Sequence, residues 1–541
     1  MNIKNTIWFL LITVLLFGGS SGYAQKRIKH KSETLSGFRK DGISYLALTG
    51  NVRFEHLGTI FLCDSAVLEK KNNHIDAYGN ITILDGDSIT ITSKELHYSG
   101  TTRIARLRKN VHLTKLNQVD LYTDYLDYYR NGSVAKYFNN GKVVDKTNVL
   151  TSNKGYFYSR TNFAAFKTKV IGENEDYTLN ADTLVYNTQS GIAYFVAPTK
   201  LTSKENNDQF TYSEGEYYTK SRRSELEEGN IETESYFLKG DKMHLDDFKG
   251  KYTVIGDVQL TAKENDVIIT GGRATHDKST ATTKIFDGAL MRMLAGQDTL
   301  YIRGDTLVSI DSKVESNKRL LAYNNAKVFK SDLQSSSDSL AYNLADSVIN
   351  FYQSPVIWAN ENQMTADTIN IEIKNAMIDK MTMKVNTFVV FQDSLKNHNQ
   401  IKGRDLIAHF ENQDLELVNI YGNGESIFFM YEEETSVLMG MNRILCSDIR
   451  LDFKEKQLID AHFLQNPEGK FIPPHELKEE DRKLNGFVWR ANERPTLENI
   501  TSTDNDIIEV EEIAPGPDVR VPSKPIKRLM IDAQEFISED K

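Results

Sequence analysis

The sequence predicts an all-β fold built as a repetitive, solenoid-like array of short strands. Two half-phrases recur about every 30 residues along residues 50–450. One reads Gly-Asn-Val-x-Φ, with Φ apolar, as at 50–54 and 79–83, and the other is a polar corner before apolar residues, as at 64–68. A fixed period in this range is typical of stacked arrays in which one repeat cannot bury its own apolar face. The shape of the array, rather than a catalytic cluster, is therefore the first indication of function.

The polar corners give a count of about 13 repeats. Between corners, apolar and polar residues alternate, as in strands with one buried face. Asn, Asp and Gly at the corners suit left-handed backbone conformations, and we interpret the corner aspartates as Asx turns that satisfy the backbone nearby. The corner residues are Asp64, Lys94, Asp124, Lys154, Asp182, Glu214, Asp241, Gly272, Asp305, Asp338, Asp367, Asp405 and Asp448.

The first 24 residues read as a cleaved export signal. Lys4 provides a basic start, residues 7–17 form an apolar run broken only by Thr13, and Gly22 and Ala24 are small residues at the cleavage-determining positions. The apolar run is too short to span a bilayer. We expect the mature chain to begin at Gln25 and to be soluble and exported.

Proline and polar composition suggest the boundaries that follow. Eight of the ten prolines come after residue 465, and a strand array excludes proline from its ladders. The very polar stretch 203–235 suggests long loops or a joint. We expect a signal peptide at 1–24, a first block of repeats at 25–202, the joint at 203–235, a second block at 236–465, a C-terminal cap at 466–500 and a flexible, acidic, proline-rich tail at 501–541.

Charge and motifs argue against several classes of function. The formal net charge is -10, with basic residues scattered among acidic ones, so no nucleic-acid footprint is present. The sequence contains no HExxH pair, no GxSxG elbow and no phosphate loop in a strand-turn-helix context. We therefore expect no enzyme activity, no cofactor, no metal site and no nucleic-acid partner.

An apolar inner wall is the remaining candidate for a functional surface. Alternation along the strands places one apolar set on the same face throughout the array. If two facing sheets splay apart, such a wall forms a groove that suits acyl chains, which gain roughly 0.8 kcal/mol per buried methylene. The residues leave open whether the sheets splay or close over a dry core. The candidate lining residues are Val52, Phe54, Ile81, Ile83, Val111, Leu113, Val258, Leu260, Val328, Val356 and Trp358.

The signal, the phrases and the period together resemble the OstA/LptA family of lipopolysaccharide-transport proteins. The resemblance is to the long OstA-like proteins of the Bacteroidetes type, without the LptD barrel, and it covers most of residues 35–450. The closest correspondence lies in residues 50–130. It is carried by Gly50-Asn51-Val52, Cys63-Asp64-Ser65, Gly79-Asn80-Ile81 and Lys109-Asn110-Val111.

The resemblance implies an open β-jellyroll whose apolar groove carries the lipid A acyl chains of lipopolysaccharide. It also implies a periplasmic bridge between the inner and outer membranes, in which jellyrolls pair end to end by their strands. The implied partners are lipopolysaccharide and the Lpt-type jellyroll proteins of the inner-membrane extractor and the outer-membrane translocon. The length after residue 450 does not accommodate a large barrel, which favours the bridge role.

Two other readings remain open on the residues alone. The array could be a structural or adhesive β-solenoid, secreted or surface-bound, with a closed core and no lipid. It could also be a β-helical enzyme acting on polysaccharides, but such an enzyme needs clustered carboxylates. The acidic residues here lie mostly at the corners, one per repeat.

Overall fold

The computed structural model describes residues 28–502. The gaps are 116–118, 146–147, 264–265, 296, 313, 360–361, 375–376, 394, 412–413, 433–435 and 456. The expected signal peptide lies outside the described residues, as does the expected tail apart from residues 501–502. Within the described part, no helix is long and apolar enough to cross a membrane.

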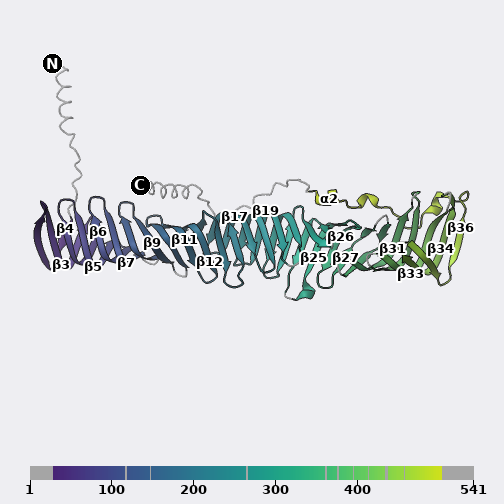
Figure 1. The fold of residues 1–541 in the computed structure, drawn as a ribbon, viewed down its shortest axis with the longest axis horizontal. Coiled ribbons are helices and arrows are strands. Elements are labelled where there is room, and N and C mark those ends of the chain that lie inside the picture. Colours follow the sequence, from purple (N-terminus) through teal and green to yellow (C-terminus); the bar gives the residue numbers. More distant parts are fainter. Residues whose placement is uncertain are drawn as a thin grey trace, which may run out of the picture. The chain divides into compact units, whose positions relative to one another are not determined.

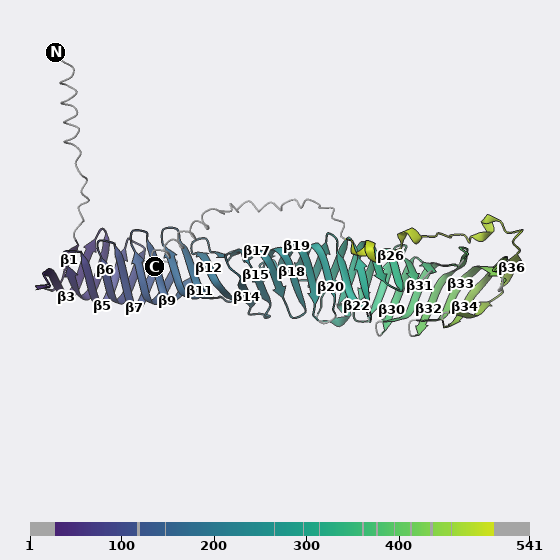
Figure 2. The same ribbon diagram turned by 45° about the horizontal axis from the view of Figure 1, so that its top comes forward.

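The predicted all-β, repetitive architecture is confirmed. The 36 strands of the described residues belong to one sheet. Neighbouring strands run antiparallel (Figures 1 and 2). From β3 to β12 they pair in chain order, whereas further along some pairs skip strands, as β12 with β14 and β13 with β16 do. One repeat of about 30 residues corresponds to a pair of strands, such as β4 with β5.

The strands of the N-terminal half are β1 (Lys29–Lys31), β2 (Thr34–Lys40), β3 (Ile43–His56), β4 (Thr59–Glu69), β5 (His74–Asp85), β6 (Ile89–Ser99), β7 (Ile104–Lys115), β8 (Val119–Tyr129), β9 (Val134–Asp145), β10 (Asn148–Tyr158), β11 (Phe163–Glu173), β12 (Tyr177–Asn187), β13 (Ile192–Phe195), β14 (Thr199–Ser203), β15 (Gln209–Tyr212), β16 (Glu214–Tyr218), β17 (Arg223–Glu232) and β18 (Tyr236–Asp246).

The C-terminal half contains β19 (Lys251–Ala262), β20 (Ile268–Asp277), β21 (Thr282–Phe286), β22 (Leu290–Ala295), β23 (Asp298–Arg303), β24 (Thr306–Ile310), β25 (Arg319–Lys330), β26 (Leu333–Asn343), β27 (Val348–Tyr352), β28 (Val356–Ala359), β29 (Asn362–Thr365), β30 (Thr368–Lys374), β31 (Met377–Gln392), β32 (His398–Glu411), β33 (Asp414–Tyr431), β34 (Leu438–Lys454), β35 (Gln457–Leu464) and β36 (Glu468–Ile472). The helical elements are the 3₁₀ turns η1 (Glu315–Asn317), η2 (Glu479–Arg482) and η3 (Ala491–Glu493) and the short helix α2 (Leu497–Thr501).

A line of β-bulges folds the sheet lengthwise into two facing half-sheets. In β5 the ladder to β6 shifts register between Tyr78 and Ile81, where Gly79 and Asn80 have φ values of 76° and 38°. Bulges bend a strand and strengthen its twist, and glycine and asparagine tolerate the left-handed conformation that they require. The recurring Gly-Asn phrase is thus the signature of this fold line, which lies in the middle of a strand.

The acidic corner residues stabilise the bulge on the neighbouring strand. Asp64 accepts a hydrogen bond of 3.0 Å from the Asn80 side chain, and Asp124 accepts one of 2.9 Å from the Asn110 backbone N–H. Similarly, the backbone N–H of Gly422 donates to a carboxylate 26 residues further along the chain. For these residues the Asx-turn interpretation is wrong, because the bonds link adjacent strands rather than adjacent residues.

The fold line requires glycine at position 79, and a substitution there tests this requirement. A Cβ atom there would lie 2.4 Å from a carboxylate oxygen of Asp64. Gly79→Ala is therefore expected to cost about 2 kcal/mol of unfolding free energy, from left-handed strain plus the lost Asp64 hydrogen bond. Gly86 is the matched control: its φ is +64° but a Cβ would meet nothing within 4 Å. Gly86→Ala should cost about 1 kcal/mol. Equal losses in urea unfolding would contradict this account.

Two expected segments take a different form in the structure. The stretch 203–235, expected as long loops or a joint, contains β15, β16 and β17, which continue the ladder. Its polar residues occupy the outer face, while Phe210 and Leu226 are buried. The segment expected as a cap, 466–500, begins with β36 on β34 and then turns back along the sheet (Figure 1).

Candidate functional site

Side-chain hydrogen bonds close the two half-sheets against each other in the N-terminal half, and we call each of these bonds a clasp. The strand ends opposite the fold line form two edges, one with turns such as 57–58 and 86–88, the other with turns such as 70–73 and 100–103. The His56 Nδ1 and the Tyr98 hydroxyl lie 2.7 Å apart across these edges. One repeat later, the Tyr128 hydroxyl donates to an Asp85 oxygen at 2.6 Å. We call the line of these contacts the seam.

Further clasps continue the seam. Lys115 donates from Nζ to the Ser159 carbonyl at 2.8 Å, and the Tyr186 hydroxyl donates to Asp145 at 2.6 Å. Another bond, of 2.9 Å, joins the Tyr177 hydroxyl to Asp247. In four of these five pairs the partners are 41 to 44 residues apart. The first partners of those four, His56, Asp85, Lys115 and Asp145, follow one another at intervals of about 30 residues, so the clasps recur with the period of the array. Behind the first clasps, apolar residues such as Phe54, Ile83 and Leu113 are at most 1% exposed.

The clasp tyrosines keep their hydroxyl protons over the ordinary pH range. Burial, followed by the hydrogen bond to Asp85, raises the pKa of Tyr128 far above its usual value. Burial likewise raises the pKa of Tyr98 to about 12. A buried hydroxyl that donates to a carboxylate stabilises the seam only while it keeps its proton.

The seam should therefore lose part of its stability at alkaline pH. The folded pKa of Tyr98 is about 12, against about 10 for an unperturbed tyrosine. Its contribution to stability, roughly 2 to 3 kcal/mol, is fully present below about pH 10 and is lost as the pH rises to about 12. Tyrosinate absorbance and circular dichroism should report this alkaline loss of stability. The loss should be smaller in Tyr98→Phe and unchanged in Tyr78→Phe, which alters an exposed tyrosine and serves as the control. Titration of Tyr98 near pH 10 would contradict the clasp.

The C-terminal half contains a large apolar groove between the same two edges. Its volume is about 1050 Å³, and it extends from Leu260 in β19 to Leu458 in β35. Both half-sheets contribute, as Met381 and Phe391 lie on either side of the fold line in β31. The main apolar residues lining it are Leu260, Ile269, Met291, Met293, Leu300, Leu320, Val328, Leu333, Ile349, Met364, Ile371, Met381, Val389, Phe391, Ile401, Leu406, Ile420 and Phe428.

The groove has the capacity for several long alkyl chains. A water-sized group needs about 10 to 15 Å³ on the same measure, so the groove holds roughly 70 to 100 carbon-sized groups. Typical small-molecule pockets reach only about 1,000 Å³ at the upper end. Charged residues lie at its mouth, where Lys330 pairs with Asp332 at 2.7 Å. An apolar trough with a polar rim suits an amphiphile with several chains.

The sequence-predicted lining residues fall into three groups. Leu260 and Val328 line the groove. Val356 and Trp358 lie on the outer face instead, because Ile357 between them is part of the core and side chains alternate along a strand. The remaining residues belong to the packed core, at most 2% exposed: Val52, Phe54, Ile81, Ile83, Val111, Leu113 and Val258.

One wall of the groove is apolar on its outer face as well. In β31, Val389 and Phe391 line the groove, while Phe388 and Val390 belong to a separate outer cluster. Residues 473–500, which we call the strap, run back over this outer face from β36 towards β26 (Figure 2). Leu484 of the strap is 2% exposed. The strap thus covers an apolar surface that would otherwise face water.

Buried glutamines fasten the strap to the wall. Gln400 in β32 donates to the Arg482 carbonyl at 2.7 Å and accepts from the Leu484 N–H at 2.8 Å. Gln363 in β29 makes the same pair of bonds, at 2.7 Å each, to the strap backbone at Val488 and Arg490. Gln334 in β26 accepts a bond of 2.8 Å from the Arg494 side chain. Each glutamine is at most 3% exposed.

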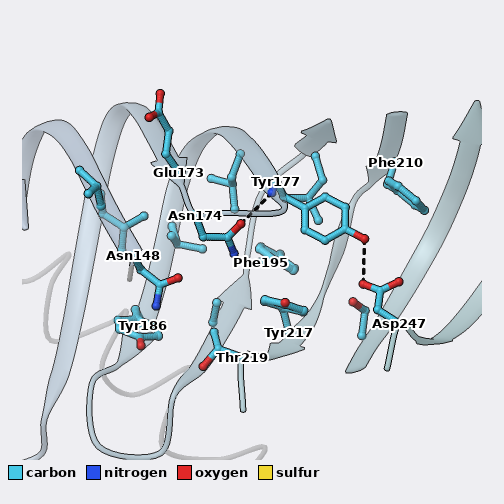
Figure 3. A pocket seen from close by; sticks show the side chains of 18 of the residues that line it. Asn148, Glu173, Asn174, Tyr177, Tyr186, Phe195, Phe210, Tyr217, Thr219 and Asp247 are labelled. Carbon is cyan, nitrogen blue, oxygen red and sulfur yellow. Dashed lines mark hydrogen bonds between the residues drawn. The ribbon is translucent and has the colours of Figure 1, made fainter. Parts of the chain in front are cut away.

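A smaller chamber interrupts the seam between β10 and β18. Its volume is about 80 Å³, and it lies between the Asp145–Tyr186 and Tyr177–Asp247 clasps (Figure 3). Its walls are apolar and are formed by Leu150, Leu179, Leu184, Ala193, Phe195 and Phe210. Outside it lies a polar vestibule of about 240 Å³.

Across the described residues, no group of three or more His, Cys, Asp or Glu side chains is placed to hold a metal ion. Both cysteines are free thiols, and burial raises the pKa of Cys63 to about 11, which makes it a poor nucleophile.

The family model described as OstA-like protein matches residues 25–182. Among solved structures, the chain is similar to LptH of Pseudomonas aeruginosa, the LptA-homologous periplasmic component of its lipopolysaccharide transport device. The identity is 21%, the match covers 21% of this chain and 80% of that chain, and the TM-score is 0.19. No curated protein matches the chain.

Proposed function

We propose that this chain, whose residues 25–182 are OstA-like, is a periplasmic bridge protein that carries lipopolysaccharide from the inner to the outer membrane. The acyl chains of the lipid occupy the C-terminal groove, and its sugars and phosphates remain at the polar rim. The export signal expected at residues 1–24 would deliver the chain to the periplasm.

The observation that carries the proposal is the groove itself. Its volume of about 1050 Å³ is at the upper limit of the volumes of small-molecule pockets, and its lining is mainly apolar. Burial of each methylene contributes roughly 0.8 kcal/mol, so several chains together provide a large driving force for binding. The lining methionines, such as Met291, Met364 and Met381, are flexible and adapt to irregular alkyl surfaces.

The ends of the sheet offer a route to assembly with other jellyrolls. In the described part of the chain, β1 and β2 pair with β3, and β35 and β36 pair with β34. Leu35 in β2 and Ile459 in β35 are more than half exposed. An exposed strand edge can be extended by a strand from a partner. The proposed partners are Lpt-type jellyroll proteins at both membranes.

Photo-crosslinking in cells tests the cargo. A photoreactive residue in place of Met364 or Phe428 should form adducts with lipopolysaccharide, because both side chains face the groove. The same residue in place of half-buried Arg53 should form none, because Arg53 alternates with buried Val52 and Phe54 and so points to the outer face. Absence of adducts at both groove positions in folded protein would overturn the proposal.

A structural β-solenoid is the second candidate, and the closed seam of the N-terminal half favours it. Buried clasps such as Asp145–Tyr186 are what a dry, rigid spacer requires. If crosslinking finds no lipid, this function becomes the better account of the whole chain.

A further inference from the structure

We propose that the chamber in the seam is a second binding site, which takes the end of one alkyl chain from a neutral, single-chain amphiphile. This inference goes beyond the groove. The chamber is lined by residues of β10 to β18 and the groove by residues of β19 to β35, and the two share no lining residue.

The position of the chamber makes it accessible from the side of the molecule. The clasps on either side are Tyr186 with Asp145 and Tyr177 with Asp247. Between them the Asn174 side chain accepts a hydrogen bond of 2.7 Å from the backbone N–H of Tyr177 and closes a local turn (Figure 3). The same residue lines both the inner chamber and the outer vestibule, so the two spaces adjoin.

The residues that line the chamber change from apolar to polar towards the vestibule. The inner walls are aliphatic and aromatic, with Leu184 and Phe195 almost completely buried. The residues shared by both spaces carry neutral hydrogen-bonding groups: Asn148, Asn174, Tyr186, Tyr217 and Thr219. An apolar end followed by a ring of neutral donors and acceptors matches an alkyl chain that ends in hydroxyl, ester or amide groups.

The charges of the vestibule favour an uncharged head group. Asp145 accepts from Tyr186, and Asp176 pairs with Arg222 at 2.7 Å. Lys220 donates to a backbone carbonyl at 3.0 Å. The vestibule thus holds three carboxylates, those of Asp145, Glu175 and Asp176, against two cations, so a fatty-acid carboxylate would enter an excess of negative charge. A glycerol or amide head group meets no such repulsion.

The size of the chamber sets a limit on the chain that it holds. Its volume of about 80 Å³ admits roughly five to eight carbon-sized groups. Within that limit each added methylene should tighten binding roughly fourfold. Beyond about eight carbons the additional methylenes should give no further gain, because they remain in the vestibule. The groove has no comparable limit.

Photolabelling of the full-length protein with monoacylglycerols tests the site. The probes carry a diazirine at the methyl end and have six, eight, ten or twelve carbons, and mass spectrometry locates the labels. We expect labels on peptides containing Leu150 or Leu179, with affinity that rises to about eight carbons and then levels off. The matching fatty acids should label these peptides less.

A variant pair isolates the chamber from the groove. Ala193→Phe fills the chamber and should abolish its labels, whereas Ala193→Ser keeps the space and the labels. Labels near Met364 in the groove should persist in both variants and show that the protein is folded. Groove labels without chamber labels in the wild type would overturn this site and leave the proposed function standing. Affinity at the chamber that keeps rising to twelve carbons would also overturn it, and no label at either place would count against both sites.

Discussion

Replacing Phe428 with glutamate is expected to reduce lipopolysaccharide binding at least tenfold and to leave the protein folded. The side chain is half-buried and faces the groove, so a carboxylate there can remain hydrated while the groove is empty. Bound acyl chains would strip that water away, and burial of an unpaired charge is strongly unfavourable. A tenfold loss corresponds to about 1.4 kcal/mol. Binding to purified protein and the melting temperature are the measurements.

Two further variants sharpen the interpretation of that result. Phe428→Leu keeps the groove apolar and should retain binding. Phe54→Glu places the same charge in the closed N-terminal core, where Phe54 is 0% exposed, and should unfold that half at a cost of more than about 4 kcal/mol. If Phe428→Glu unfolded the protein just as Phe54→Glu does, the groove would behave as a dry core.

Truncation after residue 472 is expected to convert the protein into soluble aggregates. It removes the strap and exposes the apolar outer face of the groove wall, including Trp358, Phe388 and Phe429. Contiguous apolar patches of this kind drive association in water. Light scattering and dye binding to exposed apolar surface should both increase strongly.

A chain that ends at Ser502 is the matched control, because it keeps the strap and should retain its dispersity. Gln400→Ala offers a milder test. It leaves the buried Arg482 carbonyl and Leu484 N–H without their partner and should cost about 2 to 4 kcal/mol. Faster hydrogen exchange confined to the strap would confirm the anchor. A monodisperse protein without the strap would show that it covers nothing essential.

Much of the architecture could be predicted because its cause is local. The Gly-Asn phrase needs left-handed backbone at a bulge, and Gly79 and Asn80 provide it. Alternation identified the inner face correctly for residues such as Phe54 and Ile83. The partner of the phrase, Asp64, was also recognised, although its bond reaches the next strand and not its own turn.

The location of the groove could not be predicted in this way. Whether the edges close depends on pairs such as Asp85 with Tyr128, which are 43 residues apart and have no signature in either strand. The strap was missed for a similar reason, as Gln363 and Gln400 resemble ordinary polar strand residues. One signal was present: the run Phe388-Val389-Val390-Phe391 breaks the alternation. An unbroken apolar run indicates a strand that is buried on both faces.

The strap also has a consequence for the order in which the molecule matures. Gln334 and Arg494 share a hydrogen bond across 160 residues, whereas Asp145 and Tyr186 are 41 residues apart. At about 5 to 20 residues per second, synthesis of the first pair is separated by roughly 8 to 32 s, and that of the second by roughly 2 to 8 s. The N-terminal half can therefore complete its contacts while the chain is still emerging. The C-terminal half cannot complete its groove wall until strap residues such as Arg494 have been synthesised. A chain interrupted before the strap should therefore be sensitive to proteases in its C-terminal half alone.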